Sequence, residues 1–214
     1  MTDAPVTTRE LLARCLSSGR LLIGEVLLAQ DFTLRHIADS EVDNLELFTN
    51  PVDARSIARN DAKGQFRPLK SAPNLRRGWL LETGSLMGME LALDFIYPSA
   101  LGLWLSWLKG SLQPTPLRET LSRQTGMYRI TQLLTGEQVG VLLGRCCNTE
   151  RGCLRTILWE KGTDVPHDTL PPLKFSLESL EEDRIPLICR EVCNLVIAAA
   201  RPLAKENLPK EKQK

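Results

Sequence analysis

The sequence has 214 residues, 43% of them hydrophobic, which suffices for one large domain or two small ones with a sizeable core. Its 27 Lys and Arg residues against 26 Asp and Glu residues give no global argument for binding nucleic acid. The polar N-terminus has no apolar signal core, and the apolar runs are far shorter than the roughly 20 residues that span a bilayer. We therefore expect a cytoplasmic protein with no nucleic-acid or membrane partner.

In the first half of the sequence, apolar spacing alternates between the period of a helix and that of a strand. Gln30 and Asp31 suit the turn between two strands, and Pro98 separates two apolar helices. The basic segment 63–78 is predicted to be a loop. The spacing predicts helices over residues 7–17, 52–60, 85–97 and 100–108, and strands over 24–37, 45–48 and 79–82.

The second half begins at a Pro-rich segment, residues 113–116, that we interpret as a domain boundary. Thr135 followed by Gln138 is the pattern of a helix-capping box. Asp183 as a cap and Pro186 in the first turn predict the clearest helix of the sequence. The predicted elements are helices over 117–124, 135–143 and 183–204, strands over 127–133 and 154–159, and a loop over 162–172.

These elements predict an α+β fold, in which small mixed sheets pack with helices and a long C-terminal helix carries two cysteines. We assign residues 1–112 to an α+β domain and residues 113–205 to a cysteine-rich domain. Residues 206–214 are expected to be a disordered tail, because they are short, polar and charged.

Five of the six cysteines lie in the last third of the sequence. Cytoplasmic thiols stay reduced, so this grouping is more typical of metal binding or core packing than of disulfides. Cys189 and Cys193 are four residues apart, which places them on one face of the predicted C-terminal helix, in its first two turns. Free N–H groups and the positive dipole end of a helix favour an anion there, such as an iron–sulfur cluster.

A second pair, Cys147 and Cys153, is separated by five residues, and Gly152 allows a tight turn before the second thiol. Together the two pairs predict one centre held by Cys147, Cys153, Cys189 and Cys193. Nearby arginines can offset the charge of a cluster and donate hydrogen bonds to its sulfurs. The flanking arginines are Arg145, Arg151, Arg155 and Arg190.

Other interpretations of these residues stay open. Cys146 can replace Cys147 as a ligand, although adjacent loop residues point apart, and we favour Cys147. A structural zinc site is the rival centre, with His167 as a further donor, but zinc ligands are usually about two to four residues apart within each pair. Cys146 and Cys147 can also form a redox couple. Cys15 is expected to be a core residue.

Three segments resemble a known family: RQTGMYRIT (123–131), GCLRTILW (152–159) and CREVCNLVIAAARP (189–202). They are similar to the 4Fe–4S cluster-binding domain of multidomain proteins in which a sirohydrochlorin cobaltochelatase-like (class II chelatase) module is joined to extra domains. The upstream segment FTNPVDARSIARNDAKGQFRPLKSAPNLRRGW resembles the small companion domain found there. The resemblance covers most of residues 20–205.

The resemblance implies a 4Fe–4S cluster on the four cysteines of the two pairs. It also implies a role in tetrapyrrole metabolism, in particular cobalamin biosynthesis, with a sirohydrochlorin cobaltochelatase-like protein as partner. Class II chelatases bind metal through His and acidic residues, whereas this sequence has only His36 and His167, far apart. We therefore expect a redox or sensing accessory that lacks the catalytic module. The alternative is a structural zinc-binding or metal-free interaction module with no redox role.

Seven basic residues between positions 55 and 77 are a separate feature. They can receive a polycarboxylated tetrapyrrole or an acidic partner, but we favour a solvated face with local ion pairs to Asp53 and Asp61. Segment 123–129 can surround the cluster or only lead into a strand. The seven basic residues are Arg55, Arg59, Lys63, Arg67, Lys70, Arg76 and Arg77.

Overall fold

A computed structural model of the protein describes residues 7–117, 119, 133–147, 153–160 and 183–207. The chain divides into two compact units, and each is treated by itself. The first unit comprises Met1–Leu112 and Leu177–Ile188, and the second comprises Gln113–Ser176 and Cys189–Lys214.

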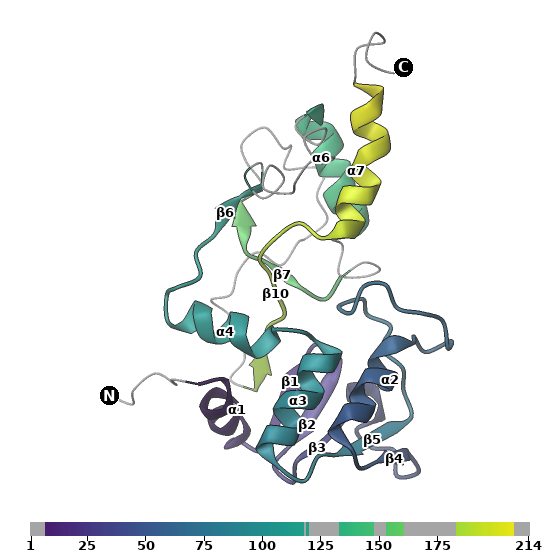
Figure 1. The fold of residues 1–214 in the computed structure, drawn as a ribbon, viewed down its shortest axis with the longest axis vertical. Helices are drawn as coiled ribbons and strands as arrows, with labels where there is room; N and C mark the ends of the chain where they lie inside the picture. Colours follow the sequence, from purple (N-terminus) through teal and green to yellow (C-terminus); the bar gives the residue numbers. More distant parts are fainter. Residues whose placement is uncertain (1–6, 118, 120–132, 148–152, 161–182, 208–214) are drawn as a thin grey trace. The chain divides into compact units, whose positions relative to one another are not determined.

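A six-stranded mixed sheet forms the centre of the first unit, in the order β4-β5-β3-β2-β1-β9 (Figure 1). Neighbouring strands are antiparallel except at the two edges, where β4 pairs with β5 and β9 pairs with β1 in parallel. The strands are β1 (Arg20–Ile23), β2 (Val26–Ala29), β3 (Thr33–His36), β4 (Glu46–Phe48), β5 (Trp79–Glu82) and β9 (Arg184–Ile185).

One face of this sheet is covered by helices. Because strand side chains alternate between faces, Leu21 and Ile23 of β1 are fully buried, as are Val26 and Leu28 of β2. Helix α3 lies in front of the sheet, with α1 and α2 packed on either side of it (Figure 1). The helices are α1 (Thr8–Leu16), α2 (Ala54–Arg59), α3 (Leu86–Ile96) and α4 (Ala100–Leu108), with short 3-10 turns η1 (Ile37–Asp39) and η2 (Pro51–Asp53).

Most of the elements predicted for the first unit are confirmed. Thr7 caps α1 through a capping box with Glu10, and Ser85 caps α3 through the Gly88 N–H. Strand β5 and helix α4 have the predicted bounds. Strand β1 is an addition, joined to β2 by a two-residue turn in which Gly24 has a φ of +59°. A residue without Cβ adopts this left-handed conformation at low cost.

The second unit is built on two packed helices, α6 (Gly136–Cys146) and α7 (Asn194–Glu206). The predicted capping box is present, since Gln138 N donates to Thr135 Oγ1 and Thr135 N donates to Gln138 Oε1. Asn207 Nδ2 also donates to Gln138 Oε1, at 2.7 Å. The start of α6 therefore lies beside the end of α7, so the two helices run antiparallel.

Four two-residue strands complete the description. Pairing is seen between β6 and β8, which are parallel, and between β7 and β10. The strands are β6 (Thr115–Pro116), β7 (Thr156–Ile157), β8 (Trp159–Glu160) and β10 (Ile188–Cys189).

The C-terminal helix is shorter than the sequence predicts. It begins at Asn194 and not at Asp183. Pro186 lies between β9 and β10 and not in the first turn of a helix. A proline holds the residue before it in the extended region, which disfavours a helix there. The β-branched Ile185 and Ile188 favour strands on either side of it. The predicted α+β class, the mixed sheet and a C-terminal helix with two cysteines at or just before its start are confirmed.

Several predictions fall outside the described residues: nearly all of the helix over 117–124 and the strand over 127–133, and the whole loop over 162–172. Among the described residues, no single helix is long and apolar enough to cross a membrane. Helices α3 and α4 meet that criterion only as a pair, and the chain bends by 103° between them.

Candidate metal centre

The end of helix α6 positions two adjacent cysteines. Cys146 is the last residue of the helix, and Cys147 caps it by donating its backbone N–H to Leu143 O at 2.8 Å. The apolar face of α6, which includes Leu142 and Leu143, is buried in the second unit and fixes this end of the helix. Cys147 is therefore held by a helix end, whereas the sequence predicts a loop.

The other pair is positioned by a strand and a helix start. Leu158 N donates to Cys189 O at 3.0 Å, which ties Cys189 to the segment that follows β7. Cys189 Sγ donates to Glu191 O at 3.4 Å. Cys193 is the N-cap of α7, and its side chain makes no capping hydrogen bond. The prediction that both thiols share one helix face is therefore wrong, because Cys189 lies on β10.

The thiols of both pairs nevertheless converge. Cys146, Cys147, Cys189 and Cys193 pack against one hydrophobic cluster of the second unit. Cys147 interacts electrostatically with all three of them, and also with Cys153. The cluster consists of Leu117, Leu134, Val139, Leu142, Leu143, Ile157, Val192, Val196, Ile197, Ala200 and Ala204.

The surroundings of Cys146 and Cys147 disfavour their thiolate forms. Burial raises the pKa of Cys147 far above its ordinary value of 9.0, and the neighbouring thiols raise it further, with Cys189 the strongest among them. Burial and Cys193 also raise the pKa of Cys146, while Arg145 lowers it. Like charges close together disfavour the ionised form. Several thiolates at this place would therefore need nearby positive charge, which bound iron would supply.

The donor set fits an iron–sulfur cluster in its chemistry. Thiolates are the usual ligands of a 4Fe–4S cluster, and each one binds a different iron atom, so the sulfurs lie farther apart than the ligands of a single ion. Among the described residues, no group of three or more His, Cys, Asp and Glu side chains is arranged to hold a single metal ion. The set of Cys147, Cys153, Cys189 and Cys193 as ligands stays a prediction.

Three comparisons with known proteins bear on this centre. Residues 109–202 match the family described as a 4Fe-4S iron-sulfur cluster binding domain, and residues 7–107 match the DR2241 stabilising domain. The resemblance seen in the sequence is confirmed. No curated protein matches the chain. The cluster-binding domain and the stabilising domain correspond in large part to the second and first units.

A solved structure, DR2241 from Deinococcus radiodurans, is also similar. It has 28% sequence identity and a TM-score of 0.70 over 92% of this chain. It is described as a multi-domain protein with structural similarity to chelatases and with two additional novel domains. This chain spans 41% of the length of that protein.

Some of the residues that the sequence predicts near the centre belong to parts of the chain that the structure does not describe. Arg151, Gly152, His167 and segment 123–129 lie outside the described residues. Arg145 is described, and its effect on Cys146 shows that one predicted arginine lies near the thiols.

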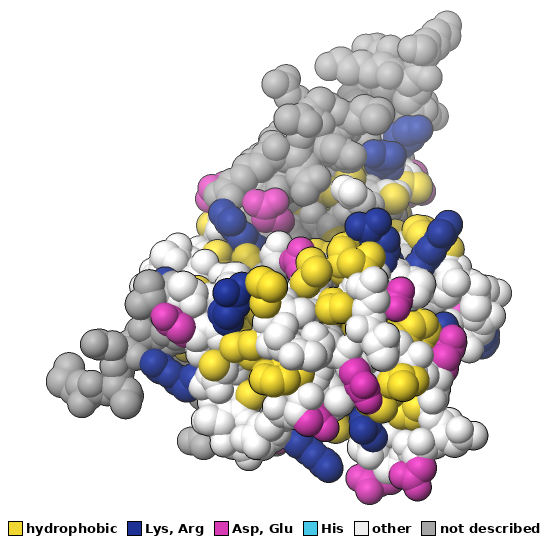
Figure 2. Space-filling model, turned by 60° about the horizontal axis from the view of Figure 1, so that its bottom comes forward, with side chains coloured by type: hydrophobic (Ala, Val, Ile, Leu, Met, Phe, Trp, Pro, Cys, Tyr) yellow, Lys and Arg dark blue, Asp and Glu magenta, His cyan; other side chains and the backbone are white. Residues whose placement is uncertain are grey.

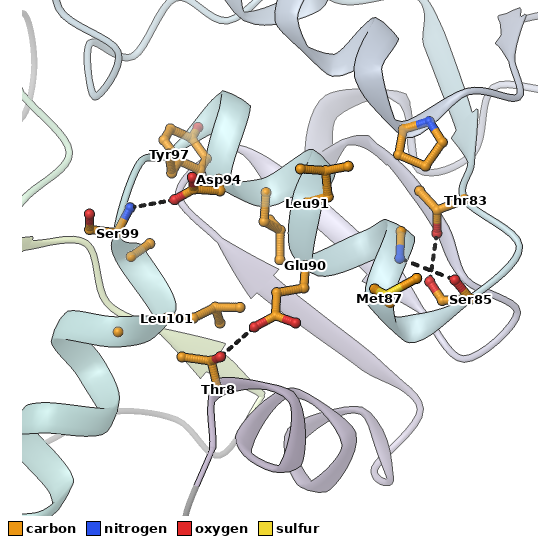
Figure 3. A pocket seen from close by; sticks show the side chains of 15 residues that line it. Thr8, Thr83, Ser85, Met87, Glu90, Leu91, Asp94, Tyr97, Ser99 and Leu101 are labelled. Carbon is orange, nitrogen blue, oxygen red and sulfur yellow. Dashed lines mark hydrogen bonds between the residues drawn. The ribbon is translucent and has the colours of Figure 1, made fainter.

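The stabilising domain contains a cavity of about 700 Å³ along α3, between α1 and α4 (Figure 3). The carboxylates in its lining accept hydrogen bonds from other residues of the same unit. Glu90 accepts hydrogen bonds from the Thr8 hydroxyl and from Arg9 Nη2, and Asp94 Oδ1 accepts from Ser99 N at 2.9 Å. The rest of the wall is largely apolar, so the cavity is not a candidate catalytic site. The apolar wall includes Met87, Leu91 and Leu101.

Arg67 corrects our interpretation of the basic stretch as a solvated face. It is only 1% exposed. Its guanidinium donates to the carbonyl oxygens of Ala58, Lys70 and Ala72 at 2.8–3.4 Å and to Asn74 Oδ1 at 2.9 Å. Arg67 therefore fixes the loop that follows α2. The sequence showed its charge, but not the four oxygen atoms that surround it.

Other members of the basic stretch also have local partners. Lys70 Nζ donates to Ala58 O at 2.7 Å, Arg76 pairs with Glu46, and the Arg55 guanidinium lies 4.7 Å from the centre of the Phe95 ring. On the face that Figure 2 shows, the described basic and acidic side chains are interspersed. These contacts fit a structural role better than an anion-binding site.

Proposed function

We propose that the chain binds a 4Fe–4S cluster through Cys147, Cys153, Cys189 and Cys193 and serves a chelatase-like partner as a redox or sensing accessory. One observation carries the proposal: the Cys147 thiol interacts with thiols from separate segments of the chain, inside a region that matches a cluster-binding family. When bound, such a cluster supplies one-electron transfer at a potential set by its surroundings.

The chain's own residues supply suitable surroundings for an anionic group. The first turn of α7 contains no acidic residue, so no carboxylate of that turn offsets the positive end of the helix dipole. The hydrophobic cluster under Cys147 and Cys193 excludes water from one side, which strengthens electrostatic interactions there. Arg145 adds positive charge next to Cys146.

The accessory role rests on the likeness to DR2241. That protein is described as similar to chelatases, and the match covers less than half of it. We infer that a chelatase-like module, in the same polypeptide or in a separate protein, works together with the stabilising and cluster-binding domains. The chain would then pass an electron to that module or report the redox state to it.

Metal analysis tests the cluster. Anaerobic reconstitution of the full chain is expected to give about four iron and four sulfide per chain, with the optical and paramagnetic spectra of a cubane. Cys147→Ser and Cys189→Ser should each lose most of the iron. Cys15→Ser, in the stabilising domain, is the matched control and should keep it. One zinc per chain would instead support the structural zinc alternative, and a chain without metal would contradict both.

Binding tests the accessory role separately. A class II sirohydrochlorin chelatase is titrated anaerobically with the loaded chain and with the metal-free chain, and heat of binding is measured. The proposal expects binding, with an affinity that depends on the cluster. If neither form binds, the accessory role is wrong, while the cluster assignment stands on its own metal analysis.

A further inference from the structure

Cys147 has four other thiols in its surroundings, which makes five in all, whereas a 4Fe–4S cluster takes four. Cys146 is the thiol that the proposed ligand set leaves over, and its side chain is partly exposed. We infer that Cys146 and Cys193 form a disulfide when the centre holds no cluster, and that this oxidation blocks cluster loading. The inference rests on the proposed function, because it concerns control of the same site.

The packing of the two helices brings these residues together. Asn207, just after α7, bonds Gln138 near the start of α6, so the opposite ends of the helices face one another. Those ends carry Cys146 and Cys193 (Figure 1). Both side chains pack against the same hydrophobic cluster. Because α6 and α7 pack directly on each other, no metal is needed to bring these two helix ends together.

Cys193 is the most suitable partner for Cys146. It caps the end of α7 that lies beside the end of α6, and it packs against the same hydrophobic cluster as Cys146, whereas Cys189 lies on strand β10. The adjacent Cys147 is a poor partner, because a relaxed disulfide needs Cα atoms about 4.4–6.8 Å apart, whereas those of neighbouring residues are about 3.8 Å apart.

The chemistry needs a two-electron oxidant, and hydrogen peroxide is the simplest one. The two thiols give up two electrons and two protons, an S–S bond forms, the O–O bond breaks, and two water molecules leave. A dithiol reductant reverses the step by thiol–disulfide exchange. While the bond is present, Cys193 cannot bind iron. The pair therefore makes cluster assembly dependent on prior reduction.

Peptide mapping tests this directly. The metal-free full chain, first reduced, is treated with hydrogen peroxide, alkylated and digested with trypsin. The expected product is CCNTER, which contains Cys146 and Cys147, linked to EVCNLVIAAARPLAK, which contains Cys193. Cys189 and Cys153 fall in other peptides, IPLICR and GCLR, so the masses identify the partner. Cys147→Ser should keep the link, and Cys146→Ser should lose it.

Cluster loading gives the second measurement. After peroxide, the wild-type chain should take up iron and sulfide only once a dithiol has been added. Cys146→Ser and Cys146→Ala should load fully without it, and Cys15→Ser should behave like the wild type. A link to Cys189 or Cys153, no link at all, or loss of iron from both Cys146 variants would overturn the inference. If the wild type never binds iron, the proposed function fails, and the peptide masses still decide whether the disulfide forms.

Discussion

Arg67 in the first unit and Cys147 in the second are both ionisable groups removed from water, and their neighbours differ in kind. Arg67 is surrounded by acceptors: three backbone carbonyls and one amide oxygen take its N–H groups. Burial lowers the pKa of Arg67, and nearby Tyr97, Glu25 and Asp61 counteract this. Cys147 is surrounded by more thiols, each of which disfavours its ionisation.

The polar groups around Arg67 need no further component, whereas the thiols around Cys147 do. The polar groups around Arg67 satisfy one another, which is typical of a buried network that fixes a fold. Each thiol around Cys147 makes ionisation of the others less favourable. This is typical of a site that a bound metal completes. We therefore expect the stabilising domain to be independent of iron and the cluster-binding domain to depend on it.

Removal of iron should give the largest effect. If the chain is loaded and then treated with a chelator without oxygen, backbone amides around Cys147, Cys189 and the start of α7 should lose most of their protection from hydrogen exchange. The metal holds together segments distant in sequence, so its binding energy is folding energy for this domain. Amides of β2 and β3 should be unchanged. Equal losses in both domains would break the comparison.

Arg67→Met should destabilise the stabilising domain by about 3–5 kcal/mol, because it removes the four hydrogen bonds that the guanidinium donates. Arg67→Lys should also be strongly destabilising, since an ammonium group cannot replace the planar fork. Chemical denaturation measures both. The exposed Arg77 offers the control, and Arg77→Met should change stability by less than about 0.5 kcal/mol. Iron content should not change in any of these variants.

Gly24→Ala should cost about 2–4 kcal/mol, from the left-handed backbone and from overpacking. A Cβ at this position would lie 2.6 Å from Tyr97 Cζ and would disturb the 2.9 Å hydrogen bond from Glu25 N to the Tyr97 hydroxyl. Gly84 has a similar φ of +65° but open space around it, so Gly84→Ala isolates the backbone cost of about 1–2 kcal/mol. Equal losses of stability in the two variants would mean that the Tyr97 side chain moves aside for the added Cβ.

Thiol reactivity should give the smallest effect. Burial raises the pKa of Cys15, and Arg14 offsets this only in part. Because the thiolate is the reactive form, Cys15 should be alkylated more slowly at pH 8 in the folded chain than in the unfolded one, about tenfold per unit of raised pKa. The rate should rise as the pH increases. Iron should leave this rate unchanged while protecting the four proposed ligand cysteines, as peptide-resolved alkylation can show.

Local signals made much of the fold predictable. The capping box at Thr135, the break at Pro98 and the apolar spacing of residues 7–17 act within a few residues, and they predicted α6, α4 and α1. Strand β9 could not be predicted in the same way. Its two residues, Arg184 and Ile185, form a strand because they pair with β1, which lies far away in the sequence.

For the candidate site, the sequence offers a set of ligands, which stays a prediction, but not their geometry. The spacing of Cys147, Cys153, Cys189 and Cys193 singled out these residues. The spacing of Cys189 and Cys193 also suggested one helix face, and that was wrong. Cys189 belongs to a strand whose partner, β7, is distant in the sequence. The four-residue spacing of two cysteines contains no information about a strand partner elsewhere in the sequence.

The parallel pairing of β9 with β1 matters for anyone who divides this chain into fragments. A fragment that stops at Leu112 would lack β9, and the N–H and C=O groups of β1 on that side would have no strand beside them. An uncovered sheet edge invites other chains to add to it, which leads to aggregation. A soluble version of the stabilising domain therefore needs the Arg184–Ile185 strand restored, for example through a short linker.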